Sequence, residues 1–250
     1  MNEDLYDELT RRTSELAAPL RVLTVGAHPD DAEFGAGATC ARWASQGAEV
    51  TMLIVTDGSK GSWDPAEPDD DHIERRIREQ EAAAAVLGAK RCIHLGHVDG
   101  EREYSVGLRL ALASHVPTVR PDIVLTHDPW QRYQMHPDHL AVGRATVDAV
   151  VTAREPRAMR DSGLPAHRPH AILLWSADEP DHAEPVDDPW FAVKMRALLC
   201  HASQGPTTMG DAGASDDHRA VFERHLRQWH EAAGVVLGVG PSETFKRLTP

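Results

Sequence analysis

The feature of the sequence that most constrains its fold is an apolar run that ends in a cluster of charged side chains. Residues 21–26 (RVLTVG) have the composition of a strand buried on both faces, and the segment Ala27–Thr39 (AHPDDAEFGAGAT) leads from it into a helix-like run. Strand, turn and helix in this order begin a parallel α/β sheet, and ligands of such sheets bind at the carboxyl ends of the strands. The turn carries His28, Asp30 and Asp31, so we expect it to be part of a functional site.

The alternation of apolar runs and helical patterns continues along the chain. Further strands are expected at residues 49–55, 91–95, 122–126 and 169–176, and further helices at residues 2–16, 72–87, 105–119, 140–154, 190–199 and 216–233. This alternation predicts a Rossmann-like α/β fold, in which helices flank a mostly parallel sheet. Because no change in composition divides the chain, we expect a single domain over residues 1–250, with a core at about 20–204 and a C-terminal helical segment at 205–250.

A second cluster of polar side chains follows the fourth expected strand. It is the segment His136–His139 (HPDH), which lies just before a helical run. In a sheet of strand order 3-2-1-4-5 the crevice opens between strands 1 and 4, so this cluster should meet the one at His28. A dinucleotide site is disfavoured there, because Gly35–Cys40 (GAGATC) lacks the third glycine of the usual fingerprint and the neighbouring carboxylates would repel a pyrophosphate.

The residue types in the two clusters suit a catalytic metal ion. Catalytic zinc takes three protein ligands and keeps a fourth position open, and His28, one of Asp30 and Asp31, and one histidine of the second cluster would supply them. The spacing leaves open which carboxylate is the ligand, and two histidines with one carboxylate also suit ferrous iron. The remaining groups could accept a proton from water and stabilise an oxyanion or a leaving amine. The sequence therefore predicts metal-assisted amide hydrolysis.

Composition and charge exclude several classes of function. The chain has 26 Lys and Arg against 39 Asp and Glu, a net charge of -13, which argues against broad binding of nucleic acid or anionic membranes. No run approaches the roughly 18 apolar residues of a membrane span, and Met1–Ala18 has no apolar leader, so we expect a cytoplasmic protein with no membrane partner. Three widely spaced cysteines, Cys40, Cys92 and Cys200, are expected to be reduced.

With both clusters in view, the sequence resembles the LmbE-like, or PIG-L, family of zinc-dependent N-deacetylases. The resemblance covers about residues 21–204 and again 242–248. The matching motifs are AHPDDAEFGAGAT, TDGSKGS at Thr56–Ser62, R-x-x-E at Arg78 and Glu81, HVDG, HPDH, and HASQ at His201–Gln204. AHPDD and HPDH together are specific, whereas the other motifs are weak when taken alone. The resemblance implies a Rossmann-like fold, in agreement with the strand pattern.

The resemblance also implies a role for each site residue. It implies that His28, Asp31 and His139 bind zinc, with another divalent ion such as Fe²⁺ as an alternative. It further implies that Asp30 is the general base, that His136 stabilises the oxyanion and protonates the leaving amine, and that Asp138 supports His136. Expected substrate contacts are Arg78, Trp130, Tyr133 and His201; for Arg78 and His201 a purely structural role stays open.

The activity implied by the resemblance is removal of acetate from the N-acetylglucosamine unit of a small conjugate. Two alternatives stay open: an amidase that acts on a glucosamine-linked thiol conjugate, and a catalytically silent sugar-binding protein of the same fold. The sequence does not select the conjugate. A homo-oligomer is expected from the resemblance alone.

Overall fold

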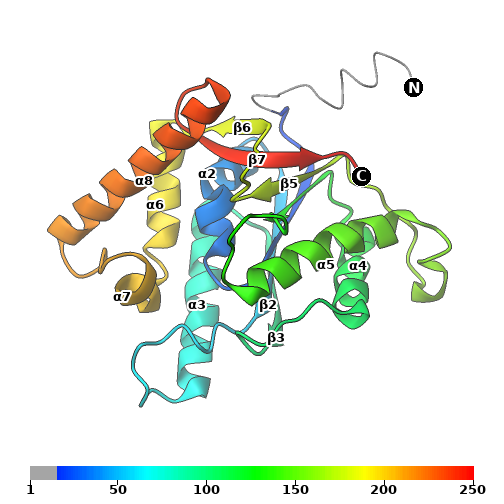
Figure 1. Ribbon diagram of the computed structural model, residues 1–250, viewed down its shortest axis with the longest axis horizontal. Coiled ribbons are helices and arrows are strands. Elements are labelled where there is room, and N and C mark those ends of the chain that lie inside the picture. Colours follow the sequence, from blue (N-terminus) through cyan, green and yellow to red (C-terminus); the bar gives the residue numbers. More distant parts are fainter. Residues whose placement is uncertain (1–15) are drawn as a thin grey trace.

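Apolar runs at the expected positions form the centre of one sheet. The computed structural model describes residues 16–250, and in this part of the chain the sheet has the strand order β3-β2-β1-β4-β5-β7-β6. The strands are β1 (Arg21–Gly26), β2 (Glu49–Thr56), β3 (Arg91–His97), β4 (Ile123–His127), β5 (Ala171–Trp175), β6 (His182–Pro185) and β7 (Ser242–Leu248). Strands β1 to β5 pair in parallel, whereas β7 is antiparallel to both β5 and β6 (Figure 1).

Helices cover both faces of the sheet. They are α2 (Asp31–Ser45), α3 (Asp69–Leu87), α4 (Val106–Val119), α5 (Pro137–Arg154), α6 (Asp188–Leu198), α7 (Gly205–Thr208) and α8 (Asp216–Leu237), with short 3-10 turns at Arg160–Ser162 and Ala202–Gln204. Helices α4 and α5 lie on one face, α2, α3 and α6 lie on the other, and α8 packs against β7 (Figure 1). In residues 16–250, no helix combines the length and apolar character that a membrane crossing requires.

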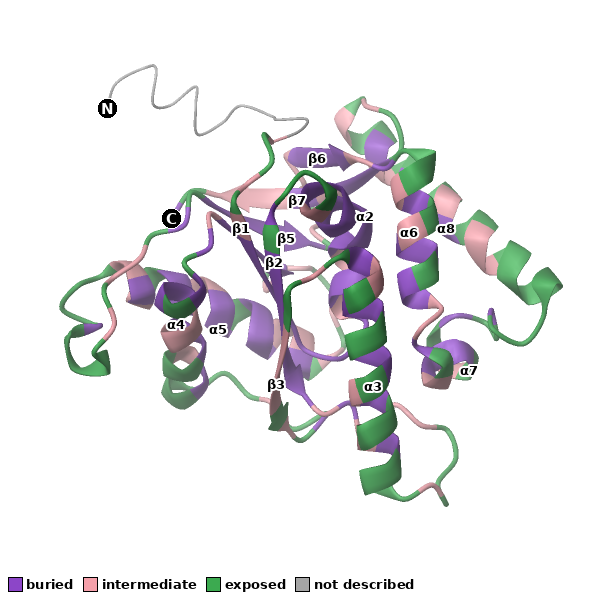
Figure 2. Cartoon of the chain, turned by 180° about the vertical axis from the view of Figure 1, so that it is seen from behind, coloured by how far each residue is buried: buried purple, intermediate pink, exposed green. Residues whose placement is uncertain are grey.

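The central strands are buried on both faces, which explains their continuous apolar sequences (Figure 2). On the face of α2 and α3, Val22 and Met52 pack with Trp43. On the opposite face, Leu23 and Leu53 pack with the residues of α4 and α5. Because alternate side chains of each strand enter different cores, the register of β1 is fixed, and so is the position of the turn that follows it.

The fold class predicted from the sequence is confirmed, and the parallel part of the sheet has the strand order 3-2-1-4-5 that was assumed for the convergence of the two clusters. The C-terminal segment 205–250 was expected to be helical, but it also contributes β7. In β7 the buried Phe245 pairs with Trp175, while polar side chains surround it, so the apolar run that marks the other strands is missing. The helix expected at residues 2–16 lies, but for its last residue, outside the described residues.

Candidate metal and catalytic site

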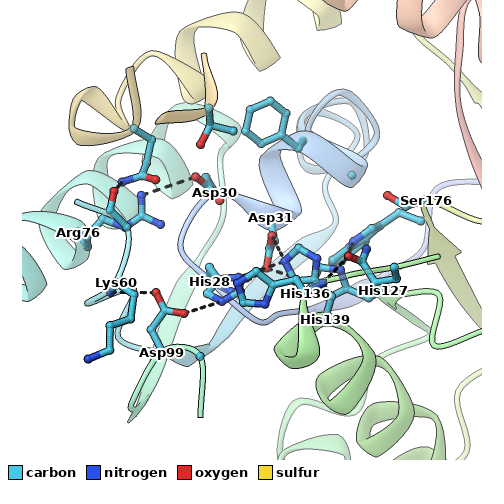
Figure 3. Close-up of a pocket in the computed structure, with 18 of the residues that line it drawn as sticks. His28, Asp30, Asp31, Lys60, Arg76, Asp99, His127, His136, His139 and Ser176 are labelled. Atoms are coloured by element: carbon cyan, nitrogen blue, oxygen red, sulfur yellow. Dashed lines mark hydrogen bonds and ion pairs between the residues drawn. The ribbon is translucent and has the colours of Figure 1, made fainter. Parts of the chain in front are cut away.

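The two polar clusters meet at the carboxyl ends of neighbouring strands. The first follows β1 and the second precedes α5, and β1 pairs directly with β4, which leads to the second cluster. As a result Nδ1 of His28 lies 3.1 Å from Nε2 of His139, although these residues are 111 positions apart. Figure 3 shows both imidazoles beside Asp31, with Asp30 and Arg76 on one side and His127 on the other.

Three donor atoms converge within this cluster. Nδ1 of His28 lies 3.4 Å from Oδ2 of Asp31, and Nε2 of His139 lies 3.3 Å from Oδ1 of the same carboxylate. In the described part of the chain, overlapping groups of side chains close enough to hold a metal ion include His28 with His136 and His139, Asp31 with His127 and His139, and His28 with Asp99 and Asp138, so each contains His28 or His139. Imidazole nitrogens and a carboxylate are the ligands that zinc and other divalent transition metals take. This part of the chain can therefore hold a divalent metal ion.

The charges around these donors also suit a cation. Three carboxylates line the cavity, those of Asp30, Asp31 and Asp99, whereas the Lys and Arg side chains that line it in the described chain are Lys60 and Arg76. All three aspartates are largely buried. Buried carboxylates require compensation by positive charge or hydrogen bonds, so a cation at the converging donors would stabilise the arrangement.

Two carboxylates orient the ring of His28. Its Nε2 lies 3.0 Å from Oδ1 of Asp99 and 3.3 Å from Oδ2 of Asp138. Backbone N–H groups of Gly100 and Arg102 donate to Asp138 and hold it in place. Burial lowers the pKa of His28, but the hydrogen bonds that its ring donates to the carboxylates of Asp138, Asp31 and Asp99 outweigh burial and raise that pKa well above its ordinary value. Carboxylates behind a ligand histidine fix which ring nitrogen is free for a metal.

These contacts change the role expected for Asp138. It was expected to support His136, but its carboxylate contacts His28 and two backbone N–H groups instead. Nδ1 of His136 has no hydrogen-bond partner among residues 16–250. The reason is the position of Asp138 in the first turn of α5, where its side chain faces the loop that follows β3.

His127, the last residue of β4, is a site residue for which no metal-binding role was predicted. Nε1 of Trp175 donates to Nδ1 of His127, so the neutral ring carries its proton on Nε2, which lies 3.0 Å from Oδ2 of Asp31. Burial lowers the pKa of His127 to about 4 despite the attraction of Asp31. His127 therefore orients the Asp31 carboxylate as a neutral donor. The sequence signal for this role was the position of His127 at the carboxyl end of a buried strand, where site residues gather.

Asp30 has a strained backbone that helix α3 holds in place. Its φ is 101°, a left-handed conformation that costs a non-glycine residue about 1–3 kcal/mol. The N–H of Asp30 donates to Oε1 of Gln80, and Nη2 of Arg76 donates to the carbonyl oxygen of Pro29. Nε2 of Gln80 donates to Oε1 of Glu33, which sets the orientation of the Gln80 amide.

The carboxylate of Asp30 lines the cavity beside a fixed cation. Nη1 of Arg76 lies 3.6 Å from Oδ2 of Asp30. Burial raises the pKa of Asp30 and outweighs the lowering by Arg76 and His201. The two aspartates thus differ: no imidazole of residues 16–250 forms a hydrogen bond or ion pair with the Asp30 carboxylate, whereas Asp31 contacts His28, His127 and His139.

The structure does not bring Arg78 to the cavity. Its side chain is 66% exposed and pairs with Glu74, whereas Arg76 lines the cavity and is 2% exposed. Side chains two positions apart on a helix, such as those of Arg76 and Arg78, point to nearly opposite sides. Arg76 and Glu79 also have the R-x-x-E spacing, and Arg76 shares its helix face with the apolar Ala83 and Leu87. The helical spacing of Arg76 from these apolar residues was the sequence signal that Arg76, and not Arg78, faces the interior.

Three other expected substrate contacts also lie away from the cavity wall. Trp130 and Tyr133 are 55% and 89% exposed, and Trp130 packs under the guanidinium of Arg144. Gln134 lines the cavity in their place. His201 is fully buried, with Nε2 3.8 Å from Oε1 of Glu33, so it lies behind the cavity wall.

The cavity has a volume of about 430 Å³, the size of a small-molecule site. Besides the charged groups and histidines named above, its walls contain Phe34, Gly35, Gly61, Gly100, Gln134, Trp175, Ser176, Gln204, Thr208 and Trp229. Polar and aromatic walls of this kind suit a ligand with hydroxyl groups.

Comparison with known proteins gives consistent matches. The family model described as PIG-L, GlcNAc-PI de-N-acetylase, matches residues 23–150. A diacetylchitobiose deacetylase from Thermococcus kodakarensis is 33% identical over 189 residues, which cover 74% of this chain and 70% of that protein. A 1D-myo-inositol 2-acetamido-2-deoxy-alpha-D-glucopyranoside deacetylase from Streptomyces avermitilis is 34% identical over 170 residues, which cover 58% of each protein.

A solved structure agrees with these matches. The N,N'-diacetylchitobiose deacetylase from Pyrococcus horikoshii superposes with a TM-score of 0.83 and 28% identity, covering 100% of this chain and 93% of that one. The family model covers half of the chain, including both polar clusters. The chain therefore belongs to the PIG-L family of LmbE-like proteins.

Proposed function

We propose that this protein is a metal-dependent deacetylase that removes acetate from an N-acetylated glucosamine unit in a small conjugate. The observation that carries the proposal is the convergence of His28, Asp31 and His139 at a cavity whose wall also contains Asp30 and His136. The names of the relatives support the reaction and the amino-sugar substrate. The family and the donor set support the metal requirement.

We assign the metal ligands to His28, Asp31 and His139. A divalent cation held there, with zinc preferred and ferrous iron also compatible, would polarise the amide carbonyl and lower the pKa of water at the site. Asp99 and Asp138 would hold Nδ1 of His28 toward the ion, and His127 would do the same for Asp31. Asp99, Asp138 and His127 would therefore contribute by orienting the metal ligands.

Asp30 and His136 carry the proton transfers in this proposal. The Asp30 carboxylate takes a proton from the water whose oxygen forms the new bond to the acetyl carbon. His136 donates a hydrogen bond to the carbonyl oxygen as negative charge develops there. When the C–N bond breaks, the leaving nitrogen receives a proton from His136 or from Asp30, and acetate and a free amine result.

We further propose that the whole chain forms one catalytic domain. Strand β7, from the C-terminal segment, pairs with β5, and Trp229 of α8 lines the same cavity as His28. A cytoplasmic location and a homo-oligomeric state stay predictions of the sequence.

The proposal is tested by acetate release from N-acetylglucosamine and N,N'-diacetylchitobiose, with metal content measured on the same samples. Asp30→Asn should bind metal and lower kcat about 10²–10⁴-fold, the range for loss of a general base. Normal turnover by Asp30→Asn would show that the assigned base is wrong. Bound ligand without turnover in the wild-type protein would instead favour a silent sugar-binding protein, and turnover restricted to glucosamine-linked thiol conjugates would favour the amidase alternative.

A further inference from the structure

The site offers more imidazole donors than a catalytic metal ion needs. In the described part of the chain, the donor atoms of Asp31, His127 and His139 lie within 4.8 Å of one another, so His127 competes with His28 for a place beside the other two. The rings of His127 and His139 stack with their centroids 4.2 Å apart, and His127 contacts Asp31 (Figure 3). If all four side chains bound one tetrahedral ion, no position would remain for water.

A hydrogen bond from the indole of Trp175 determines which nitrogen of His127 carries the proton. Nε1 of Trp175 donates to Nδ1 of His127 at 3.0 Å, and an indole N–H can only donate, so Nδ1 carries no proton. The ring proton is therefore on Nε2, which lies 3.0 Å from Oδ2 of Asp31. The N–H of Ala27 approaches the same Nε2 at 3.3 Å, a longer contact than that with the carboxylate. A ring nitrogen that carries a proton has no lone pair for a metal ion.

The same hydrogen bond opposes any change in the ring of His127. To bind an ion through Nε2, His127 would have to carry its proton on Nδ1, where it would face the N–H of Trp175. Both side chains are buried, at 5% and 2% exposed, so water cannot relieve the contact between two donors. His28 has the opposite arrangement, because carboxylates of Asp99 and Asp138 accept from its Nε2 and leave Nδ1 for an ion.

Gly35, in the first motif, leaves the space that the Trp175 indole occupies. Gly35 lies within α2 and is not among the glycines with positive φ, so its backbone does not require glycine. Alanine is favoured over glycine inside a helix. A Cβ at position 35, however, would lie 2.5 Å from Cγ and from Cδ2 of Trp175. The close packing of Gly35 and Trp175 therefore holds the indole N–H toward His127.

We propose that Trp175 is a positioning residue that keeps His127 out of the ligand set, so that the ion is held by His28, Asp31 and His139 with a coordination position left open. This inference rests on the proposed metal-dependent function and adds the group that selects between the competing imidazoles. His127 then serves as a hydrogen-bond donor to Asp31 alone. An open position distinguishes catalytic zinc sites from structural ones.

The test follows the ring nitrogens of His127 by ¹⁵N NMR in metal-free and zinc-loaded protein. His127→Gln identifies these signals by their absence. In the wild type we expect Nε2 of His127 to keep its proton when zinc binds, while ring nitrogens of His28 and His139 change. Trp175→Phe keeps an aromatic ring but removes the N–H, so we expect the proton of His127 to move to Nδ1 and Nε2 to bind zinc. A fourth protein ligand should raise the zinc affinity about tenfold.

Trp43→Phe is the matched control. Trp43 is fully buried in the same core cluster as Trp175, and its Nε1 has no hydrogen-bond partner among residues 16–250. Its replacement therefore removes an indole N–H that does not contact His127. We expect the His127 signals to be unchanged and the zinc affinity to stay within twofold of the wild-type value.

Gly35→Ala provides a second variant if Trp175→Phe folds poorly. The added Cβ displaces the indole, so we expect the same change at Nε2 of His127 and a rise in zinc affinity of about threefold. Gly107→Ala, within α4, is its control, because a Cβ there would lie 3.8 Å from its nearest neighbour, Oγ of Ser105.

The outcomes separate this inference from the function on which it rests. If the wild-type protein binds no divalent ion, both fail together. If it binds zinc and releases acetate but Nε2 of His127 binds the ion in the wild type, only the inference is wrong. It is also wrong if Trp175→Phe leaves the proton on Nε2, or lowers zinc affinity without a change at His127. A proton kept on Nε2 in the wild type and moved to Nδ1 in Trp175→Phe would support it.

Discussion

Two clusters of charged side chains lie along helix α2, and they differ in how their charges are balanced. At its first turn lies the site cluster, defined as His28, Asp30, Asp31, Asp99, His127, His136, Asp138 and His139. Farther along lies a second group, the interior cluster, defined as Arg42, His182, Glu184, Lys194 and Glu243. Ten of these thirteen side chains are buried and the other three, Asp31, His136 and His139, are partly buried, so burial alone does not distinguish the clusters.

In the interior cluster each carboxylate has a cation. Glu184 contacts Arg42 and His182, and Nζ of Lys194 lies 2.7 Å from Oε1 of Glu243. Glu243 also accepts from the N–H groups of Ala38 and Thr39, and Lys194 donates to the carbonyl oxygen of Phe34. These bonds bridge a break in α2 at Ala36, where φ is -150° and ψ is 20°. The interior cluster therefore has a structural role, in which paired charges stabilise the broken helix.

In the site cluster the carboxylates exceed the fixed cations, and the cluster opens onto a cavity. We conclude that a buried charge indicates function when no balancing charge of the chain lies beside it and a ligand can reach it. Loss of a partner in the interior cluster should therefore reduce stability, whereas changes in the site cluster should reduce metal binding or turnover.

The largest expected effect on stability comes from Lys194→Met. This change removes the cation from a fully buried Glu243, so we expect the free energy of unfolding to fall by about 3–5 kcal/mol. Denaturant unfolding followed by circular dichroism measures it. Lys246→Met is the matched control, because Lys246 pairs with Asp181 at a partly exposed position, where about 1 kcal/mol or less is expected. Equal losses in both variants would contradict the distinction between the clusters.

Asp99→Asn should have the next largest effect, which we expect on the affinity for the metal ion. The variant weakens the contact that orients His28, and we expect metal affinity to fall about 10–100-fold. Competition with a chromophoric chelator measures the affinity, with unfolding as a check on the fold. Asp181→Asn, remote from the site, serves as control. An unchanged affinity would mean that Asp138 alone is sufficient to orient His28.

Gln80→Leu should lower turnover without removing any site group. The N–H of Asp30 loses its acceptor, and the strained turn loses one of the bonds that hold it. We expect kcat to fall about tenfold, KM to change less, and stability to fall by about 1–3 kcal/mol. Gln228→Leu, at an exposed position of α8, controls for the loss of an amide. A variant with normal kcat but reduced stability would limit Gln80 to a structural role.

The smallest effect is expected for Arg78→Ala. The arginine is exposed and pairs with Glu74 one turn away, so we expect kcat/KM within twofold of wild type and a stability change of about 0.5 kcal/mol or less. Arg76→Ala, on the buried face of the same helix, should reduce turnover strongly by comparison. Similar kinetics for the two variants would contradict the corrected assignment.

Local patterns were sufficient for much of the fold. Strands β1, β2, β4 and β5 are apolar because both of their faces are buried, and the alternation of strands with helices predicted a mostly parallel sheet. Strands β6 and β7 were not predicted because they are short or largely polar, so their sequences lack a continuous apolar run. Their place in the sheet depends on pairing with strands distant in the sequence, which a local pattern does not report.

Strand and motif patterns were sufficient to predict which chemical groups gather at this site. His28, Asp30, Asp31, His136 and His139 stand at the ends of strands that are adjacent in the sheet, so their meeting followed from topology. Their contacts became known only from the packing of the folded chain: Asp138 lies behind His28, His127 lies behind Asp31, and Arg76 takes the place expected for Arg78. The physical reason is that periodicity is a property of one element, whereas the partner of a polar side chain depends on how distant elements pack.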